Sequence, residues 1–452
     1  MKEDKNQIFK EIRFNPAQVL AISFLVTILV GAILLSLPFS TTSERISFTD
    51  ALFTSTSAVC VTGLIVQDTG TYFSSVGQVI IMLLFQIGGL GIMTFSTLVL
   101  LVAGKSIAIK DSITLKEDFF HAPTLRVHSL IKNILLYTLC LESLGTLFFY
   151  LNFNHKLSAG KALFHSIFHS ISAFCNAGFC LYKDSFESYS GNIWINMNLI
   201  FLIVLGGLGF MVLKETASFF PCILKKRRVK FSLHTKLVFK ATFFLLFFSF
   251  ILFFILESNH SLQNVSFKEK IISSVFQVVT PRTAGFNTMD MNALGFGAVF
   301  LLIVLMFIGA SPGSTGGGIK TSTVGAVLAF LKSRILARES VTLSNRTIPF
   351  KLITKAFTVV TLSISVICVS VFILLISQSG VSMEEVFFEV FSAFGTVGLS
   401  LGLTPRLNDL GKIVIILTMY IGRIGPLTFL YIFTRDIPRG RYDYVEESVM
   451  IG

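Results

Sequence analysis

The sequence predicts an all-α membrane protein in which four repeated units surround one central pore. The first observation is composition: 53% of the 452 residues are hydrophobic, only 14% are charged, and the mean hydropathy is +0.77. The second is a short stretch ending in glycine that recurs three times. The third is a series of apolar runs of about 20 residues, the length that crosses a bilayer. Together these observations exclude an ordinary soluble domain.

The recurring stretch begins in three of its four copies with serine, and a glycine stands in its seventh position. The copies are Ser57–Leu64, Ser172–Phe179, Val279–Phe286 and Ser392–Leu399. Their glycines are separated by 115, 107 and 113 residues. A regular period of this size indicates an internal four-fold repeat.

Each copy follows an apolar run that is too short to span a bilayer, at 48–56, 163–171, 271–278 and 386–391. We expect a half-length pore helix there, pointing at a turn in which glycine takes a positive φ and lets carbonyls approach a ligand. Non-helical backbone at membrane depth must be buried or line a cavity. The partial negative charge at the helix C-terminus favours a cation.

Four such turns around one axis would form rings of carbonyls, which is how a filter replaces the hydration shell of potassium. The carbonyls would come from three residues in each turn. The predicted filter residues are Val61, Thr62, Gly63, Asn176, Ala177, Gly178, Thr283, Ala284, Gly285, Thr396, Val397 and Gly398.

Each unit is predicted to contain a span, a pore helix, a filter turn and a second span, which gives eight transmembrane spans. The spans lie near 17–37, 76–102, 130–151, 193–213, 236–257, 295–330, 351–376 and 410–433. The units are 17–128, 129–234, 235–348 and 349–434, with tails at 1–16 and 435–452. The run 17–37 lacks a small-residue cleavage site, so we interpret it as a retained helix and not a signal peptide.

Basic residues gather in the loops between the units, at 103–128, 214–240 and 331–355, whereas the opposite loops are sparse and mixed in sign. The positive-inside rule therefore predicts that these loops and both termini are cytoplasmic and that the turns open outward. The net charge of +12 then serves topology and contact with anionic membrane lipid, and not nucleic acid. We expect a multi-pass protein of the cell (inner) membrane.

The second span of the third unit is interrupted by the glycine-rich segment Gly309–Lys320. Pro312 removes a backbone donor and five glycines lower the helix propensity. A phosphate loop is excluded because Ile319 separates Gly318 from Lys320 and no strand precedes it. The functional interpretation is a mobile loop across the pore just inside the filter; the alternative is a packed helix break. The predicted gate residues are Gly309, Gly313, Ser314, Thr315, Gly316, Gly317, Gly318, Lys320 and Arg423.

Arg423 stands inside the last apolar span, where a charge costs at least about 2.5–3.5 kcal/mol on insertion scales. Carbonyls or hydroxyls of the 309–318 loop are its natural partners, which would place an electrostatic barrier in the pore. The alternative is that Arg423 snorkels to the cytoplasmic interface. The glycine clusters 88–91 and 206–209 are interpreted as sites of close helix packing in preference to hinges.

Other residues carry weaker signals. His165 and His169 have the spacing of a zinc pair, but no third ligand is in view, so packing or an outer-vestibule role is preferred. Glu142 either pairs with a basic group or lines the cavity, and Arg282 braces the back of the filter. The six cysteines are interpreted as free thiols: Cys60, Cys140, Cys175, Cys180, Cys222 and Cys368. No cofactor is predicted in this chain.

The four units, the broken third inner span and Arg423 resemble the Ktr/Trk/HKT superfamily of potassium transporters over nearly the whole chain. Gly309–Lys320 resembles the intramembrane gating loop of that superfamily. The early first repeat resembles the membrane subunits of the Ktr branch more than the TrkH branch, which has an extra leading helix pair. Sodium-preferring plant relatives carry serine at the first filter position, so Gly63 favours potassium.

The resemblance implies a homodimer of two separate pores and a cytoplasmic ring of nucleotide-binding regulatory subunits that opens the gate with ATP. It also implies that sodium can stimulate transport. The tail after Thr434 is too short for a nucleotide-binding domain, so such control would come from another chain.

Three functions are compatible with some of these features. Gated potassium uptake fits all of them. A sodium-coupled potassium symporter is not distinguished by sequence. A membrane-embedded enzyme would need convergent acids, bases or metal ligands, which the isolated Glu142, Arg423 and histidine pair do not supply. We therefore predict that the chain is not an enzyme.

Overall fold

The computed structural model describes residues 16–42, 45–102, 127–224, 231–343, 346–432 and 447. Most of the predicted basic loop 103–128, residues 225–230 of the second such loop, and most of both predicted tails lie outside the described residues. The described part of the chain is helical apart from one antiparallel hairpin, in which β1 (Thr342–Leu343) pairs with β2 (Arg346–Thr347).

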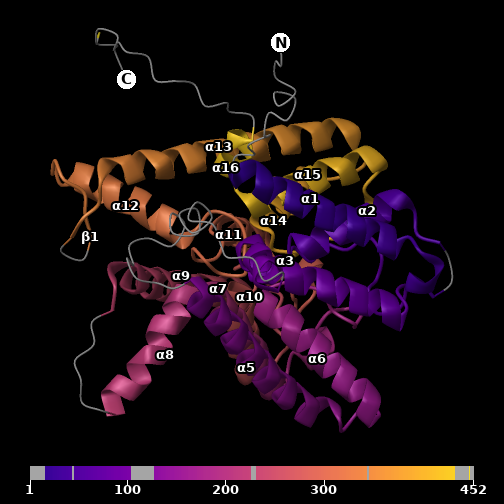
Figure 1. The fold of residues 1–452 in the computed structure, drawn as a ribbon. Coiled ribbons are helices and arrows are strands. Elements are labelled where there is room, and N and C mark those ends of the chain that lie inside the picture. Colours follow the sequence, from indigo (N-terminus) through magenta and orange to yellow (C-terminus); the bar gives the residue numbers. More distant parts are fainter. Residues whose placement is uncertain are drawn as a thin grey trace, which may run out of the picture.

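The helices follow one order four times (Figure 1). The long first helices are α1 (Pro16–Leu35), α5 (Val127–Phe153), α9 (Leu233–Glu257) and α13 (Phe350–Ser377). The short helices are α2 (Phe48–Val59), α6 (Ala159–Cys175), α10 (Phe267–Val279) and α14 (Met383–Gly395). The second helices are α3 (Ser75–Val102), α7 (Ile193–Leu208) with α8 (Phe210–Leu224), α11 (Phe296–Phe307) with α12 (Thr321–Ile335), and α15 (Asp409–Ile424) with α16 (Pro426–Tyr431). Single 3₁₀ turns are η1 (Pro38–Ser40), η2 (Glu187–Tyr189), η3 (Met291–Ala293) and η4 (Thr404–Arg406).

Serine residues fix where three of the four short helices begin. The side chains of Ser47, Ser266 and Ser382 each accept a hydrogen bond from the backbone N–H three residues later. At Ser266 and Ser382 a glutamate at that third position reaches back, which completes a capping box. Each cap satisfies a helix N–H that would otherwise be unpaired.

The helices of successive units interlock in a cyclic order. Each first helix packs on the short helix of its own unit. Each second helix also packs on the short helix of the next unit: α3 on α6, α7 on α10, α11 on α14, and α15 back on α2. The C-terminal ends of the four short helices are therefore held around a common centre.

The second helices differ from the continuous spans that the sequence predicts. α3 contains a non-helical residue at Gly91, α7 and α8 meet at Gly209 with a bend of 103°, and Gly425 separates α15 from α16. Consequently the described residues contain four helices that are long and apolar enough to cross a membrane, or five if the bent pair is one span. The count of eight spans stays a prediction.

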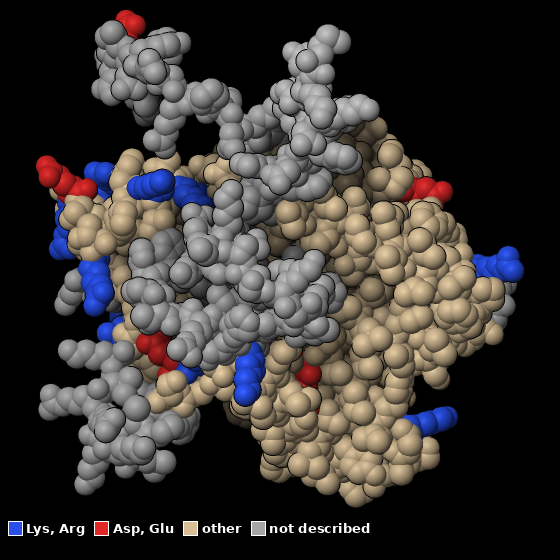
Figure 2. Space-filling view, in the orientation of Figure 1, with Lys and Arg blue, Asp and Glu red and all other residues tan. Residues whose placement is uncertain are grey.

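Apolar side chains both fill the contacts between units and cover the outside. Phe85, Phe168 and Phe179 are fully buried and pack as an aromatic group between α3 and the second unit. Phe243 and Phe248 on α9 are more than half exposed, as expected for a helix face in contact with lipid. Lys and Arg gather at one side, over α12 and the β hairpin, at the left of Figure 2.

Candidate functional site

Each short helix ends in a turn whose backbone enters the left-handed region twice. The first such residue has φ of 57° at Val61, 58° at Asn176, 72° at Thr283 and 51° at Thr396. The predicted filter glycine follows two positions later with φ between 71° and 93°. A non-glycine residue in such a conformation costs about 1–3 kcal/mol, so surrounding contacts must hold each turn in place.

Hydroxyl groups of the short helices supply those contacts. The carbonyl oxygen of Ser57 accepts a hydrogen bond from the Thr62 N–H at 2.7 Å, and its Oγ accepts one from the Gly63 N–H at 3.0 Å. Ser392 makes the same two contacts with the fourth turn, at 2.8 and 3.1 Å. The amides of these turns are thus directed back at the helix that precedes them.

The second and third turns use a related arrangement. Ser172 accepts a hydrogen bond from the Ala177 N–H at 2.8 Å through its carbonyl, and its Oγ donates to the Phe179 carbonyl at 2.8 Å. In the third turn Thr280 Oγ1 donates to the Phe286 carbonyl at 2.5 Å. These hydroxyls were not among the predicted site residues. Serine six positions before the glycine in three of the four copies was the available signal.

The four turns meet in a closed ring. Each filter glycine lies against the carbonyl oxygen of the residue before the next filter glycine, so that a Cβ on Gly63 would lie 2.5 Å from that oxygen. The pairs are Gly63 with Ala177, Gly178 with Ala284, Gly285 with Val397, and Gly398 with Thr62. Because the fourth glycine meets the first turn, the ring is complete, and it leaves no room for side chains at the glycines.

The carbonyl oxygens of the predicted filter residues have no hydrogen-bond donors among the described residues. This holds for all three residues of each turn, at 61–63, 176–178, 283–285 and 396–398. The non-glycine members are fully buried. Buried carbonyls are normally paired, because an unpaired one loses hydration without compensation. A ring of such oxygens is chemically suited to coordinate a dehydrated cation.

The glycine-rich segment 309–320 lies against this ring and against the second unit. Its ends are brought together by a parallel bridge between Ile308 and Ile319. Between them, the Ser311 N–H donates to the Gly207 carbonyl at 3.1 Å, and the Gly313 carbonyl accepts from the Phe210 N–H at 3.0 Å. The segment therefore has defined contacts on both sides of the break at Gly209.

The same segment contacts the first residues of two turns. The Gly317 N–H donates to Thr396 Oγ1 at 3.1 Å. A Cβ on Gly316 would overlap the side chain of Thr283, so the segment approaches as closely as glycine allows. Lys320 folds back on the segment, where its Nζ donates to the Gly316 carbonyl at 2.7 Å. Gly316 and Gly317 thus lie directly against the ring, and Lys320 lies against these two glycines.

Arg423 joins the segment to the first unit. Its Nη1 donates to the Thr315 carbonyl at 2.5 Å, and its Nη2 donates to the Gly88 carbonyl on α3. Thr315 Oγ1 also donates to the Phe174 carbonyl, at 3.2 Å, just before the second turn. The guanidinium is directed inward at backbone carbonyls of the loop and of α3, so the structure does not support snorkelling to the interface. A role of Arg423 in gating stays a prediction.

The glycine clusters 88–91 and 206–209 of the second helices have two roles: they allow close packing and they break the helices. A Cβ on Gly88 would overlap the Val59 carbonyl, and one on Gly206 the Phe174 carbonyl, so these glycines serve close packing as expected. Gly91 and Gly209, three residues further on, have φ of 75° and 93° and break their helices. The packing interpretation is therefore wrong for Gly91, which has nothing within 4 Å of an added Cβ, whereas Gly209 both breaks its helix and lies against the Pro312 carbonyl.

The histidine pair braces the second turn from outside. His169 is fully buried; its Nδ1 lies 2.8 Å from the His165 carbonyl, and its Nε2 accepts a hydrogen bond from the Leu181 N–H at 3.1 Å. No group of three or more metal-ligating side chains occurs in the part of the chain that the structure describes. The geometry agrees with the packing interpretation.

Glu142 and Arg282 are buried polar groups with few partners. Glu142 Oε2 accepts from Gln86 Nε2 at 3.2 Å, and the thiol of Cys175 lies beside the two groups. Its described hydrogen-bond partners include no basic group. Arg282 is buried, and its Nε and Nη2 have no partner among the described residues. Cys60, Cys140, Cys175, Cys180 and Cys368 are free thiols; the side chain of Cys222 lies outside the described set.

Neighbouring units are also tied together beyond the turns. The Phe186 N–H donates to the Asn287 carbonyl at 2.9 Å, and Asn287 Nδ2 donates to Glu187 Oε1 at 2.8 Å. Burial raises the pKa of Glu187, and the nearby Asp290 and Asp184 raise it further. The segment after the second turn is in this way fastened to the segment after the third.

Apolar helices, broken spans and a closed ring of four backbone turns are the features of a multi-pass membrane protein. The chain belongs to the TrkH family, described as cation transport proteins, which matches residues 4–444. This is a family of transporters and not of enzymes.

Similar proteins cover almost the whole chain. The Ktr system potassium uptake protein B of Bacillus subtilis (strain 168) is 42% identical over 96% of this chain and 96% of its own length. The potassium/sodium uptake protein NtpJ of Enterococcus hirae is 38% identical over 97% of this chain and 98% of its own. The crystal structure of the potassium transporter TrkH from Vibrio parahaemolyticus shares the fold, with a TM-score of 0.73, 23% identity, and coverage of 94% of this chain and 86% of that one.

Proposed function

We propose that this protein takes up potassium across the cell membrane through the ring formed by its four glycine turns. The observation that carries the proposal is the ring itself, in which twelve carbonyls, ten of them in buried residues, accept no hydrogen bond from described residues while helix hydroxyls and carbonyls engage the turn amides. The names of the similar proteins from Bacillus subtilis and Enterococcus hirae support potassium as the substrate.

In this mechanism the protein replaces water around the ion and performs no covalent chemistry. The turns are held by Ser57, Ser172, Thr280 and Ser392, so the carbonyls do not need to reorganise when an ion arrives. The C-terminal ends of the four short helices add partial negative charge from four sides. The membrane potential would drive entry with about 2.3 kcal/mol per charge for each 100 mV.

The gate in this proposal is the segment Gly309–Gly318 together with Lys320 and Arg423. Its closed position is held by Arg423, which links the Thr315 carbonyl to α3, and by the contact between Gly317 and Thr396. Two cationic side chains beside the exit of the ring would repel a permeating cation. Opening would require Arg423 to release at least one of its two carbonyls.

Control of this gate is proposed to come from a separate cytoplasmic chain. The Ktr system name of the Bacillus subtilis relative supports a partner subunit, which we expect to be a nucleotide-binding regulatory ring. We further propose a homodimer, with both termini and the basic hairpin β1–β2 on the cytoplasmic side and lipid around the exposed faces of α9 and α13.

Sodium-coupled potassium symport is the second candidate, favoured by the potassium/sodium name of the Enterococcus hirae relative. The two candidates differ in what sets the reversal potential. In a gated channel with no coupling it follows the potassium gradient alone, whereas in a symporter it shifts when the sodium gradient is changed at constant potassium.

The proposed function is tested by cation uptake into potassium-loaded proteoliposomes that contain the purified chain, with potassium, rubidium and sodium compared. We expect uptake of potassium and rubidium well above sodium. The variant Gly63→Ser should raise sodium permeation, because a side chain at φ of 90° displaces the carbonyls of the ring. Equal sodium and potassium flux in the wild type, or unchanged selectivity in Gly63→Ser, would contradict the assignment of the ring as a potassium filter.

A further inference from the structure

The fourth turn is supported by a buried carboxylate that none of the predicted roles uses. Glu389 lies on α14, nine residues before the filter glycine Gly398, and its side chain is 0% exposed. An ionised or polar group in such a position is unfavourable unless hydrogen bonds compensate for its lost hydration. The partners of Glu389 therefore indicate what it does.

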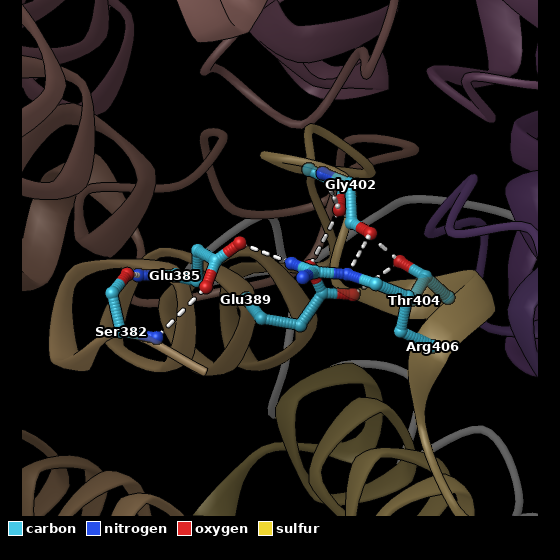
Figure 3. Close-up of polar contacts among 7 residues, drawn as sticks. Ser382, Glu385, Glu389, Gly402, Thr404 and Arg406 are labelled. Carbon is cyan, nitrogen blue, oxygen red and sulfur yellow. Dashed lines mark hydrogen bonds and ion pairs between the residues drawn. The ribbon is translucent and has the colours of Figure 1, made fainter. Parts of the chain in front are cut away.

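Both oxygens of Glu389 accept hydrogen bonds from hydroxyl groups in the segment that follows the fourth turn (Figure 3). Oε2 accepts from Ser400 Oγ at 2.7 Å, and Oε1 accepts from Thr404 Oγ1. Ser400 Oγ also accepts from the Gly402 N–H at 3.1 Å. Hydrogen bonds to a carboxylate are stronger than those between neutral groups, so this carboxylate fixes the segment 400–404 to the short helix.

Glu389 and Ser392 act on opposite sides of the same turn. They are three residues apart on α14 and thus share one face of the helix. Ser392 Oγ accepts the N–H of Gly398, while Glu389 holds Ser400, two residues after that glycine. The Gly398 carbonyl therefore lies between two attachments of the chain to one helix, and the carbonyls of Thr396 and Val397 come directly before the first of them.

A second acidic residue on the same helix provides a contrast. Glu385, one turn earlier, pairs with Arg406, and the Arg406 side chain is 50% exposed. Arg406 Nε also donates to the Gly402 carbonyl at 3.1 Å. An ion pair at the surface contributes little to stability, and this one makes no contact with Ser400 or Thr404. Glu385 is therefore a matched control for Glu389.

The equivalent positions of the other units show that this carboxylate is particular to the fourth. Nine residues before their glycines stand Thr54, His169 and Phe276. His169 also holds the segment after its turn, through the Leu181 N–H, but as a ring nitrogen. Thr54 Oγ1 has no partner among the described residues, and Phe276 has no polar group. A carboxylate occupies this position in one quarter of the ring.

We propose that Glu389 is a positioning residue for ion selectivity: by binding the hydroxyls of Ser400 and Thr404 it fixes the fourth turn, and so the shape of the carbonyl ring. This inference rests on the proposed potassium filter. The effect on selectivity comes from the two hydrogen bonds and not from the negative charge, because both carboxylate oxygens are already bound to hydroxyl groups.

The test compares potassium and sodium uptake by proteoliposomes that contain the whole chain, as a ratio measured in one preparation. Glu389→Leu removes both attachments and should lower the potassium-to-sodium ratio several-fold. Glu389→Gln can still accept from Thr404 and donate to Ser400, so its ratio should stay near that of the wild type. Glu385→Gln should likewise leave the ratio unchanged. Adding Ser400→Ala and Thr404→Val to the Glu389→Leu variant should cause no further loss, since the partners are already unbound.

An unchanged ratio in Glu389→Leu would overturn the inference. An equal loss of the ratio in Glu389→Gln would overturn the inference, because the effect would then come from the charge. An equal loss of the ratio in Glu385→Gln would show that the effect is not specific to Glu389. If the Glu389→Leu variant is not recovered folded, Ser400→Ala decides the matter: a lowered ratio supports the proposal and an unchanged one overturns it. A wild type without potassium preference would instead contradict the proposed filter itself.

Discussion

The four turns and the four second helices come from the same repeat, yet they differ in how closely their copies agree. In the turns, the four filter glycines have φ within 71–93° and each lies against the next turn in one cyclic order. In the second helices, three breaks occur at single glycines with φ of 75–93°, whereas the third helix is interrupted by the long segment 309–320. In the proposed function an ion at the centre would require similar oxygens from every side, whereas a gate would require only one moving part. The glycines of the ring are nearly symmetric, and among the second helices the long interruption belongs to the third unit.

The largest expected effect comes from breaking the ring itself. Gly398→Ala should reduce potassium uptake by about tenfold or more, because a Cβ there overlaps the Thr62 carbonyl in addition to the roughly 1–3 kcal/mol cost of positive φ. Gly380→Ala is the matched control: Gly380 has φ of 71° but nothing within 4 Å of an added Cβ. Uptake in proteoliposomes measures both. Equal loss in the two variants would attribute the effect to backbone strain and not to the ring.

The next effect tests the proposed gate, in which Arg423 of the fourth unit holds the segment 309–320 of the third. Arg423→Gln should raise uptake several-fold in the absence of any regulator, because it weakens the links to Thr315 and Gly88 and removes a charge beside the exit. Arg406→Gln, at an exposed arginine outside these contacts, should change nothing. Lower uptake in Arg423→Gln, with the protein folded, would count against a closed gate.

Deleting residues 313–317 examines the segment more directly. The deletion removes Thr315, which accepts from Arg423, and Gly317, which donates to Thr396. Flux should rise while potassium preference is retained, since the ring does not include these residues. Flux equal to or below that of the wild type would be evidence that the segment is a packed break without a gating role.

A smaller effect is expected from a single attachment of one turn. Ser57→Ala removes the acceptor of the Gly63 N–H and should lower the potassium-to-sodium ratio a few-fold, in line with about 1 kcal/mol for one hydrogen bond. Thr56→Ala is the control, because its hydroxyl donates only to the Leu52 carbonyl within its own helix. If the potassium-to-sodium ratio fell equally in Thr56→Ala, the loss would come from a disturbed helix α2 and not from the lost hydrogen bond to the Gly63 amide.

The smallest effect separates the two uses of glycine in the second helices. Gly91→Ala meets no atom within 4 Å, so only its φ of 75° opposes the substitution, and we expect a thermal unfolding temperature lowered by a few degrees with normal uptake. Gly88→Ala overlaps the Val59 carbonyl and should disturb uptake as well. If Gly88→Ala and Gly91→Ala changed uptake and unfolding temperature equally, the distinction between a glycine that allows close packing and one that breaks the helix would be contradicted.

The sequence predicts the turns well because their information is local. Gly63, Gly178, Gly285 and Gly398 recur at a readable period, and a glycine that must accept positive φ is visible as a residue type. The TrkH family membership agrees with the resemblance drawn from them. The contact between Arg423 and the glycine-rich segment was also expected, since a charge inside an apolar span requires a partner.

Other features could not be predicted in this way because they depend on three-dimensional contacts and on the local backbone conformation. Gly88 and Gly91 are the same residue type three positions apart, and only the neighbouring Val59 carbonyl and the local φ distinguish packing from a break. The hydroxyl of Ser57 binds the amide of Gly63 within the first turn, and the carboxylate of Glu389 binds hydroxyls after the fourth turn; neither partner is determined by residue type alone. The partner of Glu142, Gln86, comes from another unit and carries no charge that would have indicated it.

Arg423 binds two groups that every amino acid possesses. The oxygens of residues 88 and 315 belong to the peptide backbone, so the acceptors themselves do not depend on residue type. Comparisons of correlated substitutions between pairs of positions would therefore not detect this connection, however strongly it acts. Natural variation can adjust its strength through the arginine, whereas the two carbonyls can change only if the chain path itself changes.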